Sequence, residues 1–265
     1  NGGQIKFLKE LKASRVNLSR ELNIEEIRFL SACGKKENVL TEVFVHGSYC
    51  ISFSGVCYMS SVLSGKSGNR GQCSQQCREK YLPSPLGKEF PLNLKDNSAY
   101  FDLNELADAG VASLKIEGRI KEFEYVYTVV NSWREQLRHY YSNSKQIDNN
   151  AALRQVFNRD FSNGYLKGDI GEGMFIDNPM SQSSQGKDDQ ERNDLYSEKA
   201  IKRSEIESRI DSVSADKIPV RISVSGELGS PLKIFVDDQG AGFSVSSTIN
   251  FAAKGSEALT AKIVL

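Results

Sequence analysis

The stretch Glu42-Val43-Phe44-Val45-His46-Gly47-Ser48-Tyr49-Cys50 decides how this sequence folds. Its apolar centre predicts a buried strand, and Gly47 ends that strand. The residues that follow, up to about position 90, are irregular and rich in Ser, Gly and Cys. A loop of this length inside a compact domain is usually functional. The stretch therefore predicts a core strand that delivers the chain into a functional loop.

Strands and helices alternate on both sides of this strand. Residues 15–20 alternate like a strand, and Asn23 with Glu26 resembles a capping box that begins a helix. We expect this helix to end at Gly34. Downstream, the pattern predicts a short strand, a helix closed by glycine, a strand ended by glycine and a long helix, at residues 90–95, 103–110, 111–118 and 121–141.

The long helix carries an apolar stripe that we interpret as core. Its members recur at helical spacing: Phe123, Val126, Tyr127, Val130, Trp133, Leu137 and Tyr140.

This order of elements predicts an α/β fold with a parallel sheet. The few units present cannot close an eight-stranded barrel, so we expect a partial TIM-like (β/α) barrel. Arg20, His46 and Glu117 come at the ends of predicted strands. In such barrels the chemistry lies at the carboxyl ends of the strands, which makes these positions candidates for the site.

The C-terminal part changes in character. Residues 178–217 are charged and Ser-rich, which predicts a linker with a solvated helix near 198–210. Residues 220–224 and 232–236 then alternate strictly, and residues 242–250 form a further candidate strand, so a small antiparallel β module follows. The predicted divisions are the barrel part with its Cys-rich loop, an extension, the linker with its helix, and the β module, at residues 1–141, 142–177, 178–217 and 218–265.

Charge and composition exclude several classes of protein. Lys and Arg number 34, as do Asp and Glu, so any contact with nucleic acid needs a local basic patch. No apolar run is long enough to span a membrane, and we expect no membrane partner. No signal peptide is visible, and the start without Met indicates a fragment. An odd number of cysteines without a secretory signal favours a reducing, cytoplasmic location.

Four of the five cysteines cluster as Cys50-x6-Cys57-x15-Cys73-x3-Cys77, and Cys33 stands apart. Four thiolates bind either an iron–sulfur cluster or tetrahedral zinc. Zinc ribbons pair two short knuckles, whereas here only the second pair is close. The spacing therefore favours a [4Fe–4S] cluster, with zinc as the alternative metal. Buried apolar cysteines that merely lie near one another remain the simpler interpretation.

Basic residues accompany the cysteines, and they suit a phosphate backbone or a small dicarboxylate. The candidates for binding substrate are Arg70, Arg78, Arg119 and Lys121. A solvated basic loop would look the same. His46 and Glu117 are candidates for proton transfer, although a histidine that caps its own strand is the simpler interpretation of His46. The sequence contains no H-E-x-x-H, G-x-S-x-G or P-loop motif.

Several separate motifs, in order, resemble peptidase family U32. They are Glu42 to Cys50, Ser54-Gly55-Val56-Cys57-Tyr58-Met59-Ser60, residues 69–78, Leu114-Lys115-Ile116-Glu117-Gly118-Arg119, Asn158-Arg159-Asp160-Phe161 and Gly164-Tyr165. The resemblance covers roughly residues 10–175. The tail after residue 200 is similar to the accessory domain of the longer members, which are linked to hydroxylation of 23S rRNA cytidine.

The resemblance implies a TIM-like barrel and, from several members, a [4Fe–4S] cluster that would map onto Cys50, Cys57, Cys73 and Cys77. It implies oxygen-independent hydroxylation of rRNA or tRNA bases or of ubiquinone precursors, with prephenate as a source in the RNA cases. The family name comes from collagenase activity reported for some members.

Three functions follow as hypotheses. The first is an iron–sulfur enzyme that hydroxylates an RNA base. The second is a peptidase of collagenase type, for which Ser54 or a cysteine is the available nucleophile, with no evident base beside it. The third is a non-enzymatic RNA-binding module that a metal stabilises.

Overall fold

The computed structural model describes residues 1–54, 56–82, 85, 87–184 and 189–212, and four strand segments beyond them. The chain divides into two compact units, residues 1–203 and 204–265, which are described separately here.

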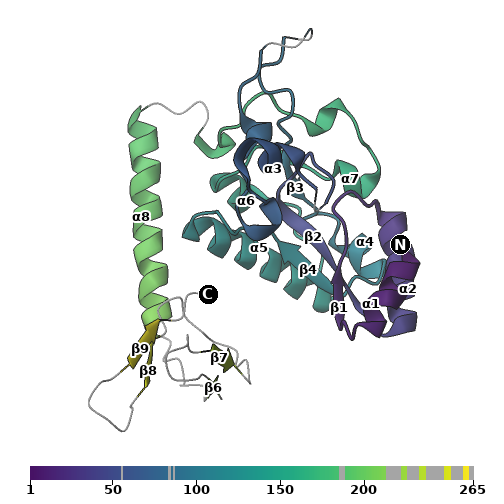
Figure 1. Cartoon of the computed structure of the whole chain (residues 1–265). Coiled ribbons are helices and arrows are strands. Elements are labelled where there is room, and N and C mark those ends of the chain that lie inside the picture. The colour runs from purple at the N-terminus through teal and green to yellow at the C-terminus, as the bar shows by residue number, and fades with distance from the viewer. Residues whose placement is uncertain are drawn as a thin grey trace. The chain divides into compact units, whose positions relative to one another are not determined.

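The first unit is built on a mixed sheet with β2 (Leu40–Ser48) at its centre (Figure 1). Strands β1 (Arg15–Asn17) and β4 (Ser113–Ile116) both pair with β2 in parallel. His46 of β2 pairs with Ile116 on one edge and with Ser98 on the other. The α/β class is thus confirmed, and the barrel predicted from the sequence stays a prediction.

The expectation of a purely parallel sheet is wrong at β3 (Asp96–Ser98), which runs antiparallel to β2. The strand expected at 90–95 lies later in the chain, and Leu94 makes only an isolated bridge with Phe175. Asn97 fixes β3 by donating its side-chain amide to the carbonyl oxygen of Phe44, 3.0 Å away. On its other side β3 pairs in parallel with β5 (Phe161–Ser162).

Helices pack beside one another against this sheet, as β/α units require (Figure 1). The helices of the first unit up to residue 167 are α1 (Gly2–Glu10), α2 (Ile24–Glu37), α3 (Tyr58–Ser64), α4 (Leu103–Asp108), α5 (Phe123–Tyr141), α6 (Ala151–Gln155) and α7 (Gly164–Lys167). Short 3-10 turns occur at Gly68–Arg70, Gln76–Arg78, Glu172–Met174 and Gln182–Ser184.

Helix α2 begins as its sequence predicts and ends later. Asn23 Oδ1 accepts the backbone N–H of Glu26, and the Glu26 carboxylate accepts that of Asn23, so the capping box is confirmed. The helix passes Gly34 and stops at Asn38, which takes the left-handed conformation at φ 55°. Gly34 serves close packing instead, because a Cβ there would lie 2.5 Å from the carbonyl oxygen of Val39.

Helix α5 is confirmed, but its buried face is rotated from the predicted stripe. Tyr125, Val129, Trp133 and Gln136 face the core, whereas Val126 and Val130 of the predicted stripe are each 37% exposed. Gln136 can be buried because its amide donates to the carbonyl of Tyr100 and accepts from the N–H of Ile147. A search for apolar residues alone could not assign Gln136 to this face.

The long helix α8 (Asp189–Ser212) contains the solvated helix predicted near 198–210. Beyond it, β6 (Ile222–Ser225) pairs antiparallel with β7 (Lys233–Val236), which confirms that predicted pair. Strand β8 (Thr248–Phe251) pairs with β9 (Leu259–Lys262); residues 242–247 of the candidate strand lie outside the described residues. Within the described part of the chain, none of the helices is both long and apolar enough to traverse a membrane.

Candidate functional site

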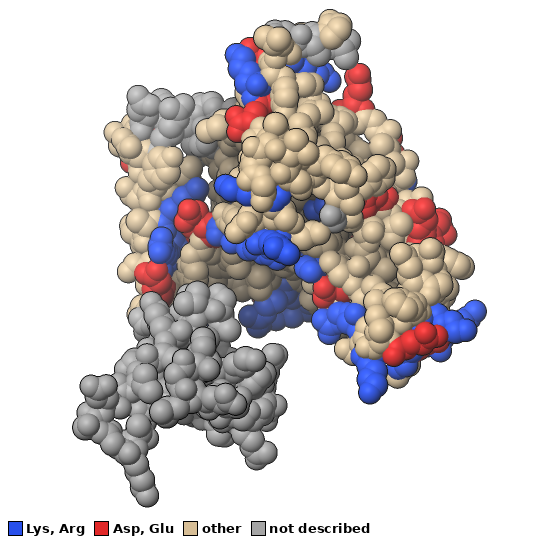
Figure 2. All heavy atoms as spheres, in the orientation of Figure 1, with Lys and Arg blue, Asp and Glu red and all other residues tan. Residues whose placement is uncertain are grey.

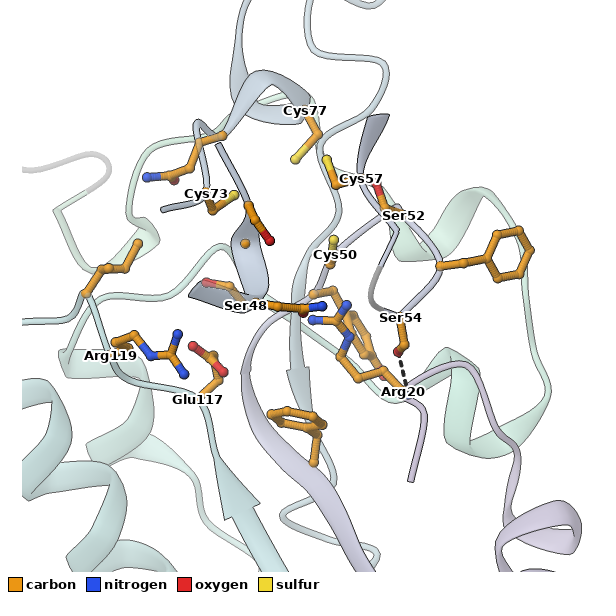
Figure 3. Close-up of a pocket in the computed structure, with 18 of the residues that line it drawn as sticks. Arg20, Ser48, Cys50, Ser52, Ser54, Cys57, Cys73, Cys77, Glu117 and Arg119 are labelled. Atoms are coloured by element: carbon orange, nitrogen blue, oxygen red, sulfur yellow. Dashed lines mark hydrogen bonds between the residues drawn. The ribbon is translucent and has the colours of Figure 1, made fainter. Parts of the chain in front are cut away.

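A cavity of about 520 Å³ lies at the carboxyl ends of the parallel strands (Figure 3). Arg20 follows β1, Ser48 ends β2, and Glu117 follows β4, and all three line it. Open parallel sheets bind ligands at this edge because the loops after the strands converge there. Two of the three residues that the sequence predicts at strand ends, Arg20 and Glu117, thus line one cavity.

All four clustered cysteines line this same cavity. Cys50 follows β2, Cys57 precedes α3, and Cys77 lies in a 3-10 turn, with Cys73 just before it. Figure 3 shows their sulfur atoms directed toward a shared space above Ser48 and Glu117. Each is a free thiol, as is Cys33, which lies on α2 and does not line the cavity.

The thiols differ in their surroundings. Hydrogen bonding to Ser52 and Ser60 lowers the pKa of Cys57, whose Sγ lies 3.5 Å from Ser60 Oγ. Burial raises the pKa of Cys77, and negative charge on the other three cysteines would add to that rise. Across the described residues, no three His, Cys, Asp or Glu side chains lie close enough together to hold one metal ion.

Arg78 was predicted to bind substrate, but its guanidinium is already engaged. Nη1 donates to Asn93 Oδ1 and to the carbonyl oxygen of Leu94, each at 2.5 Å. Nη2 donates to the carbonyl oxygen of Tyr49 at 2.6 Å. Because Tyr49 precedes Cys50 and Arg78 follows Cys77, this side chain joins the two ends of the cysteine loop.

Positive charge dominates the cavity. Glu117 is the one carboxylate among its described lining residues. The lining cations are Arg20, Arg78, Lys115, Arg119, Lys121 and Arg159. Figure 2 shows Lys and Arg side chains gathered across the middle of the face that is drawn. A chain without net charge therefore concentrates positive charge at this site, whereas Arg70 of the predicted set does not line it.

Arg159 also lines the cavity, although the sequence did not predict it as a site residue. It is 5% exposed, and its Nη1 lies 3.0 Å from the Asp96 carboxylate and 3.2 Å from Ser48 Oγ. Its Nε donates to the carbonyl oxygen of Pro179. The Asn158-Arg159-Asp160 motif was the available signal, but only the fold brings this residue beneath the cysteine loop.

His46 lies beneath the cavity rather than in its wall. It is 2% exposed, and its ring packs near those of Phe161 and Tyr125, with centroids 5.4 and 6.3 Å away. Burial lowers its pKa to about 4, so the imidazole is neutral at pH 7. With Arg20 and Glu117 it borders a void of about 10 Å³. A proton-transfer role for His46 stays a prediction.

Comparisons with known proteins agree with these motifs. Residues 1–174 match the model of peptidase family U32. The chain is 40% identical over 138 residues to the 23S rRNA 5-hydroxycytidine C2501 synthase of Escherichia coli. This aligned region makes up 50% of this chain and 21% of that protein. It is 35% identical over 176 residues to a collagenase of Porphyromonas gingivalis (59% of this chain, 42% of that protein).

A third relative is tRNA hydroxylation protein P1 of Bacillus subtilis, which is 32% identical over 193 residues (66% of this chain, 45% of that protein). The chain thus spans between about a fifth and a half of the length of these relatives. No solved structure matches the chain.

Proposed function

The chain belongs to peptidase family U32, and from this membership we propose that it supports oxygen-independent hydroxylation of an rRNA or tRNA base with an iron–sulfur cluster held by Cys50, Cys57, Cys73 and Cys77. The observation that carries the proposal is the meeting of four free thiols and a set of cations in one cavity. Relatives named for rRNA and tRNA hydroxylation support RNA as the substrate.

The arrangement of the thiols favours a cluster over zinc. A single zinc ion needs four ligands within bonding distance of one point. In a four-iron cluster each iron takes one thiolate, so the sulfur atoms stand farther apart. The spacing Cys50-x6-Cys57-x15-Cys73-x3-Cys77 lacks the two short knuckles of a zinc ribbon, and all four cysteines face one cavity. A bound cluster would supply one-electron transfer.

The surrounding residues divide the remaining tasks. Arg20 and Arg119 offer guanidinium groups to a phosphate or to a carboxylate, including a small dicarboxylate such as prephenate. Glu117 is placed to hold a proton at the cavity wall. Arg159 binds Asp96 and Ser48 at the cavity, and Arg78 holds the cysteine loop through the carbonyl oxygen of Tyr49. The strands behind them would form an arc of a (β/α) barrel, with the site at its usual carboxyl edge.

Nucleoside analysis of cellular RNA tests the function. Cells that lack the gene are supplied with the wild-type protein, with Cys73→Ser, or with Cys33→Ser as the matched control. Mass spectrometry of digested rRNA and tRNA then measures the hydroxylated nucleosides. We expect the wild type and Cys33→Ser to restore one such nucleoside and Cys73→Ser not to. Restoration by Cys73→Ser, or by none of the three, would contradict the proposal.

The relative named collagenase supports a second candidate, a peptidase. Ser54 donates its hydroxyl to Glu21 Oε2 at 3.0 Å, and neither histidine of the chain lines the cavity in the described part. A serine nucleophile therefore lacks a histidine base here. Digestion of gelatin by the purified protein, lost in Ser54→Ala or Cys73→Ser, would favour the peptidase. RNA binding without either activity would favour the metal-stabilised RNA-binding module.

A further inference from the structure

The charged end of Lys121 lies against two aromatic rings. Its Nζ lies 3.4 Å from the ring centroid of Phe157 and 5.6 Å from that of Tyr125. Within the described residues it makes no side-chain hydrogen bond and no ion pair. The amine is thus held by two aromatic rings while its residue lines the cavity.

Lys115 shows the ordinary alternative in the same cavity. Its Nζ lies 3.6 Å from Glu42 Oε1, and its side chain is 40% exposed. A carboxylate and solvent both stabilise an ammonium, and Lys115 has both beside it. Among the described residues, no carboxylate forms an ion pair with Lys121, which follows the same strand in the loop after it.

Burial is the main effect that disfavours the protonated form of Lys121. Burial lowers its pKa to about 8, and the positive charges of Arg159 and Arg78 act in the same direction. Asp96 and Glu117 oppose this shift without reversing it. A desolvated lysine beside other cations, in a cavity, is the environment in which the amine becomes a nucleophile toward carbonyl carbon.

Groups that would hold a carboxylate lie in the same wall. Arg119 lines the cavity two residues before Lys121, and it makes no hydrogen bond or ion pair with a described residue. Arg159 uses Nε and Nη1 for protein contacts and leaves Nη2 without one in the described part of the chain. A cavity of about 520 Å³ accommodates a small organic acid.

We propose that Lys121 forms a Schiff base with a small α-keto acid whose carboxylate is held by Arg119 and Arg159. This site uses the cavity of the proposed function but needs neither its cluster nor RNA. The neutral amine attacks the keto carbon, a C–N bond forms, and the carbonyl oxygen takes up a proton. The resulting carbinolamine loses water as the C=N bond forms. Amine and ketone thus give imine and water, with no change in oxidation state and with Glu117 as the neighbouring proton carrier.

Reductive trapping tests this assignment. The purified full chain, kept free of metal and RNA, is incubated with pyruvate as the probe and reduced with sodium borohydride. Mass spectrometry of the intact protein and of its peptides then locates the adduct. We expect one reduced adduct, on Lys121, and at least a tenfold loss of labelling in Lys121→Arg. Lys115→Arg is the matched control and should label like the wild type.

Each other outcome overturns the proposal. An unlabelled wild type means that Lys121 acts only as a charge, a role that arginine would keep. Labelling spread over many lysines, or unchanged in Lys121→Arg, means that no site is formed. Acetone, which lacks the carboxylate, should label Lys121 far less than pyruvate does; equal labelling would show that no carboxylate is held there and would overturn the proposed site. Because the assay contains no iron, its result is independent of the cluster.

Discussion

Arg78 is the side chain that ties the cysteine loop to the sheet region beneath it. Its three hydrogen bonds reach Asn93, Leu94 and Tyr49, on segments that come close only in the folded chain. A planar guanidinium reaches these acceptors from two nitrogen atoms held at fixed positions, whereas a lysine ammonium offers all its donors from one point.

Replacing Arg78 by lysine should therefore weaken both the fold and the metal site. We expect the free energy of unfolding to fall by about 1 to 3 kcal/mol, because buried carbonyl groups lose their donors. Iron bound per chain after anaerobic reconstitution should fall although all four cysteines remain. Arg70→Lys, on the same loop but exposed and away from the cavity wall, should change neither quantity. Equal effects of the two substitutions would refute the assigned role of Arg78.

His46 makes stability depend on pH. Its pKa is lowered from 6.5 to about 4 in the folded protein, by burial and against the attraction of Asp96. In the unfolded chain His46 binds a proton below about pH 6.5, whereas in the folded chain it does so only below about pH 4. Stability is therefore lost as pH falls through this range, by about 3 kcal/mol for this one residue.

Urea unfolding at several pH values measures this effect. In His46→Gln the loss of stability between pH 6.5 and pH 4 should be smaller than in the wild type by that amount. His139→Gln, which replaces the other histidine of the chain near the end of α5, is the matched control. An identical pH profile for wild type and His46→Gln would show that the imidazole titrates normally.

At the scale of elements, β2 and β4 approach each other closely where the site begins. The register shifts between Phe44 and His46, so His46 lies opposite Ile116, and Gly47 follows at φ 125°. A Cβ on Gly47 would lie 2.6 Å from both the Cβ and the carbonyl oxygen of Glu117. Only glycine allows this approach, which places Glu117 at the cavity.

Gly47→Ala should be strongly destabilising, by roughly 2 to 4 kcal/mol, because a disallowed backbone conformation is combined with a clash. Gly65→Ala is the matched control: Gly65 also has a positive φ, of 60°, but nothing lies within 4 Å of an added Cβ. We expect Gly65→Ala to lower the free energy of unfolding by only about 1 kcal/mol. Thermal and urea unfolding give both values, and a Gly47→Ala variant no less stable than Gly65→Ala would rule out the close contact with Glu117.

Elements whose signals are local could be predicted from the sequence. The capping box at Asn23, the apolar run of β2 and the glycine after α4 depend on neighbours along the chain. Strand β3 could not be found, because it is held by long-range pairing and by the Asn97 amide. The buried face of α5 was misplaced because Gln136 is satisfied by Tyr100 and Ile147, distant partners that periodicity does not show.

At the scale of the whole molecule, the four cysteines, Arg119, Glu117 and Lys121 were identified from their spacing and from their positions at strand ends. Arg159 joins them from a distant segment through Asp96 and Ser48, a contact that only the fold creates. Arg78 was identified as part of the site, but its role depends on acceptors that the sequence cannot show. Proximity along the chain thus predicted most of these cavity-lining residues, and their roles stay predictions.

The concentration of cations at the cavity of an uncharged chain predicts salt-dependent RNA binding. Filter binding of single-stranded RNA over a salt series should give a linear fall of log affinity with log salt. Arg119→Gln should lower the magnitude of that slope by about 0.7, the value for one phosphate contact. Lys9→Gln, exposed on α1, is the control and should leave the slope unchanged. An unchanged slope in Arg119→Gln would exclude Arg119 as a phosphate contact.

The proposed function depends on one arrangement, in which thiols from separate segments would hold an iron–sulfur cluster at the carboxyl edge of the sheet. The most direct measurement is iron and acid-labile sulfide per chain, with the absorption spectrum, on protein reconstituted and kept without oxygen. We predict about four iron per wild-type chain and broad absorption near 400 nm, both lost in Cys73→Ser and kept in Cys33→Ser. A colourless wild-type protein without iron, or one that binds a single zinc ion, would contradict the account.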